Sequence, residues 1–304
     1  MEKIIYQVDA FADRPFGGNP AGVVPDSRGL SEKEMQKIAR EMNLSETAFV
    51  TALRDEEADF HVRFFTPEQE VDLCGHATIA AFYVMTKKGY IEVNGGKKVI
   101  TQKTKAGTLP VEIEIAQTDQ IHVMMTQAKP MFGEQIKDIG VLAEIMGTKE
   151  DEIGISGKTI LPQIVSTGLH DIIMPVVSLK ALKRIKPDME RLALYSKQMG
   201  VIGVHAFTLE KEEDASYLSA RNFAPACGID EEAATGTSNG ALGAYLVNNN
   251  IIALEKEATI LCEQGYYMGR PSKIMVKLIG DKENYCVRVG GTAFITLEGV
   301  IVYS

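Results

Sequence analysis

The two halves of the chain repeat the same order of short sequence blocks, and this repeat constrains the fold more than any other feature. Thr47–Val50 (TAFV) resembles His205–Thr208 (HAFT), and Arg63–Pro67 (RFFTP) resembles Arg221–Pro225 (RNFAP). Both pairs lie 158 positions apart, since 205 − 47 = 158 and 221 − 63 = 158. Repeats of 20 to 50 residues would predict a solenoid, whereas one large offset predicts a duplicated domain with a pseudo-twofold axis. Chance matching of so few letters is the alternative.

The repeat extends to a glycine followed by an Ala-rich segment. Cys74-Gly75-His76 aligns with Thr235-Gly236-Thr237 at an offset of 161, because 235 − 74 = 161. Apolar periodicity predicts helices over Ser31–Met42, Gly75–Lys87, Val141–Met146, Met189–Gly200 and Thr237–Asn248. Ser31 suits an N-cap with Glu34 three residues on. Short alternating segments elsewhere predict strands, and the Gly- and Pro-rich segment Ala12–Gly22 predicts a loop.

Length and charge narrow the class of protein. A chain of 304 residues fits two domains. The net charge of −9 and the lack of a basic cluster argue against nucleic acid or an anionic membrane as a partner. The N-terminus shows no signal-peptide pattern and no segment is apolar enough to span a membrane, so we expect a soluble, cytoplasmic protein. The four cysteines are scattered, which predicts neither a disulfide framework nor a zinc site.

Gly75 and Gly236 each lie at a predicted loop-to-helix junction. A helix N-terminus exposes free N–H groups and the positive end of the helix dipole, and glycine lets a ligand approach the backbone. Two such termini are typical of a carboxylate-binding site. The alternative is an ordinary helix start, since every helix has one.

Two side chains near the first junction are candidates for proton transfer. Glu46 begins an apolar strand, so partial burial is expected to raise its pKa toward general acid–base use. His76 lies at a helix start, where the dipole favours its neutral form. A surface Glu and a structural His are the alternatives. The position of Glu46 in the second half is Val204, so the repeat does not keep this carboxylate.

Two further segments are candidates for ligand contacts. Asp230-Glu231-Glu232 precedes Gly236, and one of these carboxylates is in a position to reach the same site; the alternative is a solvated turn. Gly17–Gly22, which contains Asn19, is richer in glycine than a simple connection needs. It is not a phosphate-binding P-loop, because no Gly-Lys-Ser/Thr follows.

Taken together, these blocks resemble the phenazine-biosynthesis isomerase-like (PhzF-like) family. The matching stretches are Val8–Phe11, Gly17–Gly22, Leu44–Val50, Phe64–Pro67, Val71–Thr78 and Arg221–Gly236, in the order of the family and over nearly the whole chain. The resemblance implies an α+β fold like that of diaminopimelate epimerase, with two similar domains, each a β-barrel-like sheet around a central helix. It places the boundaries at 1–118 plus about 289–304 and at 119–288, and it implies a site between the domains and a homodimer.

The resemblance also implies roles for individual residues. Glu46 would move a proton between two carbons of a small carboxylate, as a Glu does with dihydro-hydroxyanthranilate in the phenazine enzyme. Asn19, Gly75, His76, Glu232, Gly236 and Thr237 would bind the substrate. The family usually reads Glu-Asp-Pro-Ala-Thr-Gly-Ser where this chain has Glu231–Thr237, so Glu232 replaces Asp and Thr237 replaces Ser. This departure leaves the substrate open.

Three functions are therefore compatible with the sequence. The first is an isomerase without cofactor or metal, in which Glu46 shuttles the proton. The second is a cysteine-pair racemase or epimerase, in which Cys74 would be one thiol; the equivalent second position, however, is Thr235, a poor acid–base group. The third is a non-catalytic protein that binds a small ligand on the same fold.

Overall fold

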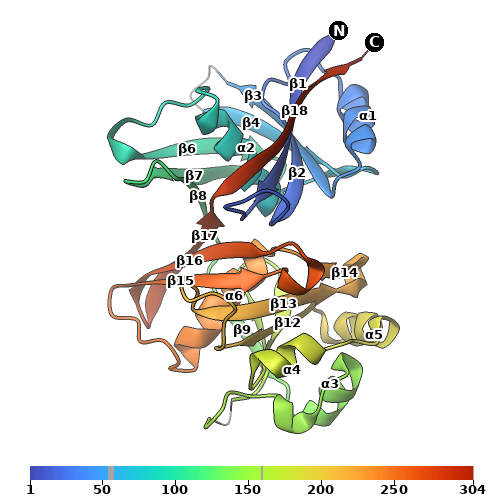
Figure 1. Ribbon diagram of the computed structural model, residues 1–304, viewed down its shortest axis with the longest axis vertical. Coiled ribbons are helices and arrows are strands. Elements are labelled where there is room, and N and C mark those ends of the chain that lie inside the picture. The colour runs from blue at the N-terminus through green and yellow to red at the C-terminus, as the bar shows by residue number, and fades with distance from the viewer. Residues whose placement is uncertain (54–57, 159, 304) are drawn as a thin grey trace. The chain divides into compact units, whose positions relative to one another are not determined.

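The structure is a computed structural model that describes residues 1–53, 58–158 and 160–303 (Figure 1). It divides into two compact units. Unit 1 comprises residues 1–125 and 290–304, and unit 2 comprises residues 126–289.

Unit 1 is a sheet with two α-helices. Its elements are β1 (Glu2–Ala10), β2 (Asn19–Val24), α1 (Glu32–Met42), β3 (Glu46–Ala52), β4 (Phe60–Phe65), β5 (Glu70–Val71), α2 (Gly75–Lys87), β6 (Lys97–Thr104), β7 (Gly107–Ile115), β8 (Ile121–Thr126) and β18 (Ala293–Val302). Pairing runs β18–β1–β2–β3–β4–β6–β7–β8. The β2–β3 and β4–β6 pairs are parallel and the others antiparallel.

Unit 2 has the same plan with added helices. Its elements are β9 (Met131–Gln135), α3 (Ile139–Met146), β10 (Gln163–Ser166), β11 (His170–Pro175), α4 (Leu179–Arg184), α5 (Met189–Met199), β12 (Gly203–Thr208), β13 (Leu218–Ala224), β14 (Ile229–Glu232), α6 (Gly236–Asn248), β15 (Glu257–Gln264), β16 (Ser272–Asp281) and β17 (Asn284–Gly291). Pairing runs β9–β10–β11–β12–β13–β15–β16, with β11–β12 and β13–β15 parallel.

The two units share one order of strand directions. From β18 in unit 1 and from β9 in unit 2, the successive pairs are antiparallel, antiparallel, parallel, antiparallel, parallel and antiparallel. The predicted duplication and the α+β class are therefore confirmed. Within the repeat, the register differs by one residue: Phe49 pairs with Arg63, but Arg221 pairs with Ala206, not with Phe207.

Each unit has one helix that its strands bury on almost all sides. Residues 76–82 of α2 and residues 238–247 of α6 are all buried, and both segments are rich in small residues. α2 packs against β1, β2, β3 and β18, and α6 packs against β10, β11, β12 and β16. A helix that is apolar all round is typical of such a core position. Close packing needs small residues: a Cβ at Gly243 would lie 2.8 Å from Val276 Cγ1.

The helix α1 has a different character. Ser31 caps it, and Glu34 completes a capping box, as the sequence predicted. Its apolar side places Met35 and Ile38 in a cluster with Phe49 and Phe65. The helix therefore packs against β3 in unit 1.

One sequence prediction in this region is wrong. Asn19–Gly22, expected within a loop, forms the start of β2 and pairs with β1 on one side and, from Ala21, with β3 on the other. Pro20 lacks an N–H group but tolerates a position near the start of a strand. The predictions also missed α4 and the strands β5, β9 and β14; β9 is exposed along its whole length and so shows no buried face.

None of the helices in the described ranges is long and apolar enough to cross a membrane.

Candidate active site

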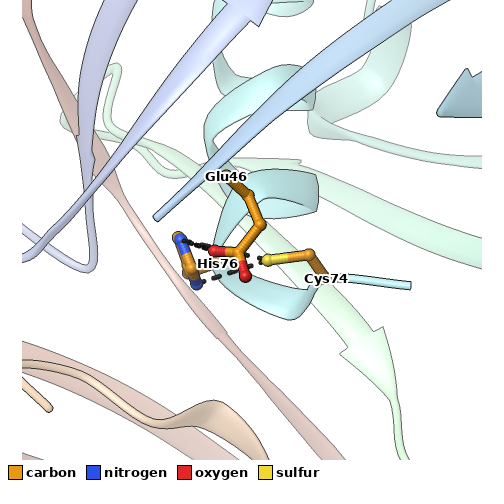
Figure 2. A group of neighbouring side chains, drawn as sticks. All are labelled: Glu46, Cys74 and His76. Carbon is orange, nitrogen blue, oxygen red and sulfur yellow. Dashed lines mark hydrogen bonds and ion pairs between the residues drawn. The ribbon is translucent and has the colours of Figure 1, made fainter. Parts of the chain in front are cut away.

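Three side chains of unit 1 meet where α2 begins. Glu46 is the first residue of β3, Cys74 is the N-cap of α2, and His76 is its second residue (Figure 2). His76 Nε2 lies 3.2 Å from Glu46 Oε2, and His76 Nδ1 lies 3.4 Å from Cys74 Sγ. Ser45 Oγ lies 3.2 Å from His76 Nε2. The local fold explains the convergence, since β3 starts beside the buried helix on which it packs.

The charges of this cluster differ from the sequence predictions. Burial alone would raise the pKa of Glu46, but interactions with His76, Ser45 and Cys74 outweigh it, and the pKa of this carboxyl is lowered. Burial opposes protonation of His76, yet its contacts with Cys74 and Glu46 raise the pKa of the imidazole well above its usual value. The predicted raised pKa of Glu46 and neutral His76 are therefore wrong, because each group has a partner that the sequence did not reveal.

The pair is thus a carboxylate beside an imidazolium. Cys74 stays a neutral thiol at neutral pH because burial raises its pKa. The Glu46 side chain is 20% exposed, but its Oε2 atom is buried and has no hydrogen bond of good geometry, although His76 lies close. A buried carboxylate oxygen with an open lone pair is suited to accept a proton from a ligand.

The same three side chains are the group most suited to a metal ion in the described residues. One ligand atom each from Glu46, Cys74 and His76 lies within 4.8 Å of the others. The two ring nitrogens of His76 already contact the Glu46 carboxylate and the Cys74 sulfur, an arrangement that suits a protonated ring. The expectation of a site without metal stays a prediction.

The helices α2 and α6 have uncapped N-termini. Among the six α-helices of the described residues, α1, α3, α4 and α5 have a Ser or Asp side chain that caps the first turn. The N-cap residues of the other two, Cys74 and Thr235, make no such bond. Their first N–H groups therefore remain available to an anion. A Cβ at Gly75 would meet nothing within 4 Å, so the start of α2 is open.

The predicted residues of the second half form a separate group in unit 2. Glu232 ends β14, Gly236 begins α6, and both Gly236 and Thr237 are partly exposed. Thr235 Oγ1 donates to Glu232 Oε2 at 2.5 Å, and Thr167 Oγ1 donates to the Thr237 carbonyl at 3.0 Å. The glutamate, one methylene longer than the family's aspartate, is therefore held against the residue that precedes the helix.

Gln264 holds the segment between β14 and α6 in place through hydrogen bonds. It is 1% exposed, accepts from Thr235 N and Asn239 Nδ2 with Oε1, and donates to the Glu232 carbonyl with Nε2 at 2.7 Å. Nothing in the sequence pointed to this residue, because a Gln at the end of a strand is ordinary. A glutamine that makes bonds with both ends of its amide holds a loop in one conformation.

The remaining predicted residue, Asn19, is buried at the start of β2. Ser45 Oγ donates to the neighbouring Pro20 carbonyl at 3.4 Å, so Asn19 lies near Ser45 and the start of β3 at Glu46. The structure brings Glu46, Gly75 and His76 together in unit 1, and Glu232, Gly236 and Thr237 together in unit 2.

Known proteins are similar to this chain in sequence and in fold. The chain is 38% identical over 303 residues to an uncharacterized isomerase of Clostridium acetobutylicum, covering 98% of this chain and 97% of that protein. It is 34% identical to an uncharacterized isomerase of Bacillus subtilis, covering 100% and 97%. A crystal structure of a PhzF-family phenazine biosynthesis protein from Bacillus anthracis superposes with a TM-score of 0.89 at 30% identity and covers both chains completely.

A more distant match extends the fold to another group of enzymes. A hydroxyproline epimerase from Agrobacterium vitis has a TM-score of 0.61 at 14% identity, covering 99% of this chain and 92% of that one, which shows a shared fold. The curated relatives of 38% and 34% identity are named isomerases, and the chain is an isomerase on a duplicated α+β fold. Residues 8–299 match the family model described as phenazine biosynthesis-like protein (PhzC-PhzF), and the chain belongs to this family.

Proposed function

We propose that the protein isomerises a small carboxylate compound by moving a proton between two carbons, with Glu46 as the proton carrier. The observation that carries this proposal is the ionised, largely buried Glu46, whose Oε2 atom has no aligned donor and lies 3.2 Å from His76. The site Asp of the family is Glu232 here and the site Ser is Thr237; both keep their functional groups.

The proposed reaction balances without a co-reactant. The Glu46 carboxylate accepts a proton from one carbon of a conjugated acid and becomes a carboxylic acid. The electron pair of the broken C–H bond shifts the double bond, and Glu46 then returns the proton to another carbon of the same π-system. No electron leaves the substrate, so the step needs no redox cofactor.

Other groups would stabilise the charge that develops. The imidazolium of His76 lies next to the carboxylate, and its positive charge would stabilise negative charge that develops on the substrate. The uncapped N-termini of α2 and α6 supply N–H groups suited to a carboxylate. Glu232 and Thr237 would orient the substrate. The homodimer and the cytoplasmic location remain predictions.

The first experiment follows proton exchange. The protein is incubated in deuterium oxide with a panel of small carboxylic acids that includes dihydro-hydroxyanthranilate and several amino acids, and NMR detects carbon-bound deuterium and shifted double bonds. Glu46→Gln keeps the shape of the side chain but removes the base, so we expect a rate lower by about 10³-fold. The exposed Glu41, changed to Gln, is the matched control and should keep the wild-type rate.

The same assay separates the alternatives. If Cys74→Ser abolishes exchange while Glu46→Gln does not, the reaction is that of a cysteine racemase. This alternative lacks a second thiol at the equivalent position, where Thr235 is bonded to Glu232. If no acid exchanges but one raises the melting temperature, the protein binds a ligand without turning it over.

A further inference from the structure

A second buried carboxylate lies beside the first turn of α6. Asp171, in β11, is fully buried, and Ser238, the third residue of α6, donates a hydrogen bond to its Oδ2 atom. Asn222 Nδ2 lies 3.2 Å from Ser238 Oγ and 3.2 Å from His205 Nδ1. All four side chains have 0% exposure, and Asp171 Oδ1 has no hydrogen-bond partner. The chain of contacts joins the helix to three strands of unit 2.

In the described part of the chain, no cation offsets the charge of this carboxylate. On the neighbouring strands, Asp171 lies opposite Val165 and Gly203. His205, two residues further along β12, is neutral because burial lowers its pKa to about 3. The cation of β13, Arg221, is paired with Glu231 at 2.8 Å. Within the described residues, no ion pair includes Asp171.

The other titratable groups near Asp171 make its ionisation less favourable. Burial is the main cause that raises the pKa of Asp171, the Ser238 hydrogen bond opposes it, and the charge of Glu232 adds to it, giving a pKa of about 7. The charge of Asp171 in turn acts on the exposed thiol of Cys227. Asp171 is therefore divided between its two protonation states near neutral pH.

Asp171 lies beside the first turn of α6, so its charge acts on an anion bound at the N-terminus of this helix. The first N–H groups of α6 have no side-chain cap, and Gly236 and Thr237 are partly exposed there. An ionised Asp171 behind the same turn repels a bound carboxylate, whereas the protonated acid does not. Nothing in the sequence singled out Asp171, because a polar residue at the start of an apolar segment is ordinary.

We propose that Asp171 takes up a proton when a carboxylate ligand binds at the N-terminus of α6. The inference rests on the proposed function, in which the N-terminus of α6 is one of the two helix ends suited to the carboxylate of the substrate. The proton comes from solvent, and no other bond changes. The site therefore binds a monoanionic carboxylate in the state in which Asp171 is neutral.

The sign of the pH dependence follows from this linkage. Below about pH 7 Asp171 is already protonated, so affinity does not depend on its titration. Above that pH, binding has to be accompanied by proton uptake, and affinity falls by about tenfold per pH unit. The uptake approaches one proton per ligand about one pH unit above the pKa.

The test measures this proton directly. The full chain is titrated with 2-aminobenzoate, a stable monoanionic aromatic acid, by calorimetry at about pH 6 and about pH 8. Two buffers of different ionisation enthalpy at each pH give the number of protons taken up. We expect about one proton and weaker binding at the higher pH for the wild type, and neither effect for Asp171→Asn.

Two further variants keep the test decisive if Asp171→Asn does not fold. Ser238→Ala removes the bond that lowers the pKa of Asp171, so the fall in affinity should begin at a higher pH. Asp230→Asn removes an exposed carboxylate of β14 and should keep the wild-type linkage.

The possible failures have different meanings. Binding without proton uptake in the wild type, or the same uptake in Asp171→Asn, overturns the inference and leaves the proposed function intact. Failure of 2-aminobenzoate and of every acid in the exchange panel to bind at either pH overturns the proposed function, and the inference with it.

Discussion

At the residue scale, the central feature is the pairing of Glu46 with His76. The carboxylate keeps the imidazole charged, and the raised pKa of His76 depends on Cys74 and Glu46. We therefore predict that Glu46→Gln lowers the pKa of His76. The change is measured by NMR titration of the His76 ring. An unchanged titration would show that the Glu46 carboxylate does not keep the imidazole charged.

The same pair, Glu46 and His76, makes the stability of the folded protein depend on pH. The pKa of His76 is higher in the folded than in the unfolded protein, so its stabilisation is complete below about pH 6.5 and is lost as the pH rises through the folded pKa. The pKa of Glu46 is lowered on folding, so its contribution is lost as the pH falls through that value. His205 is the internal reference for the titration, since burial keeps it neutral at neutral pH.

The sequence predicted which residues lie at this site, but it did not predict their charges. Glu46, Gly75 and His76 were predicted from position and resemblance, and they meet in the structure. Their charges could not be predicted, because a pKa depends on partners within a few ångströms, which spacing along the chain does not give. Asp171 and Gln264 escaped prediction for the same reason, since only the fold brings them beneath the first turn of α6.

At the element scale, local signals predicted the helices well. Ser31 with Glu34 marked the start of α1, and α2 was predicted to the residue. β2 was missed because Pro20 and its neighbouring glycines are typical of a loop; its pairing with β1 and β3 depends on residues distant in the chain. Local signals therefore identified five of the six α-helices of the described residues, capped or not, but missed a strand whose partners are distant in the chain.

The glycine at the start of α2 supplies an element-scale prediction. A methyl group at Gly75 would meet nothing within 4 Å, so Gly75→Ala should change the melting temperature by no more than about 2 °C. The same methyl lies where a ligand would approach the helix N–H groups, so binding of 2-aminobenzoate should weaken by about tenfold. Thermal unfolding and calorimetry measure the two effects.

The control variant lies within the other central helix. A Cβ at Gly243 would lie 2.8 Å from Val276 Cγ1 and 3.5 Å from Ile260 Cδ1. Gly243→Ala should therefore destabilise the protein by about 1–3 kcal/mol through overpacking. If Gly75→Ala is the more destabilising of the two, Gly75 has a structural role and the open helix start is not a ligand site.

At the scale of the whole molecule, the chain returns to unit 1 only at its end. β18 pairs with β1 over nine positions, while unit 2 is one continuous segment with its own core. Deletion of residues 290–304 would leave β1 without its antiparallel partner on that side. Unit 1 should then lose stability, and unit 2 should not.

Hydrogen exchange followed by mass spectrometry measures this difference. We expect amides of β1 and β2 to exchange at least about a hundredfold faster in the shortened chain, and amides of β12 and β13 to change by less than about threefold. A chain that lacks only residues 303 and 304 keeps all of β18 and should retain protection in β1. If the longer deletion also accelerates exchange in β12 and β13 a hundredfold, the two units unfold together and not independently, although each has its own core.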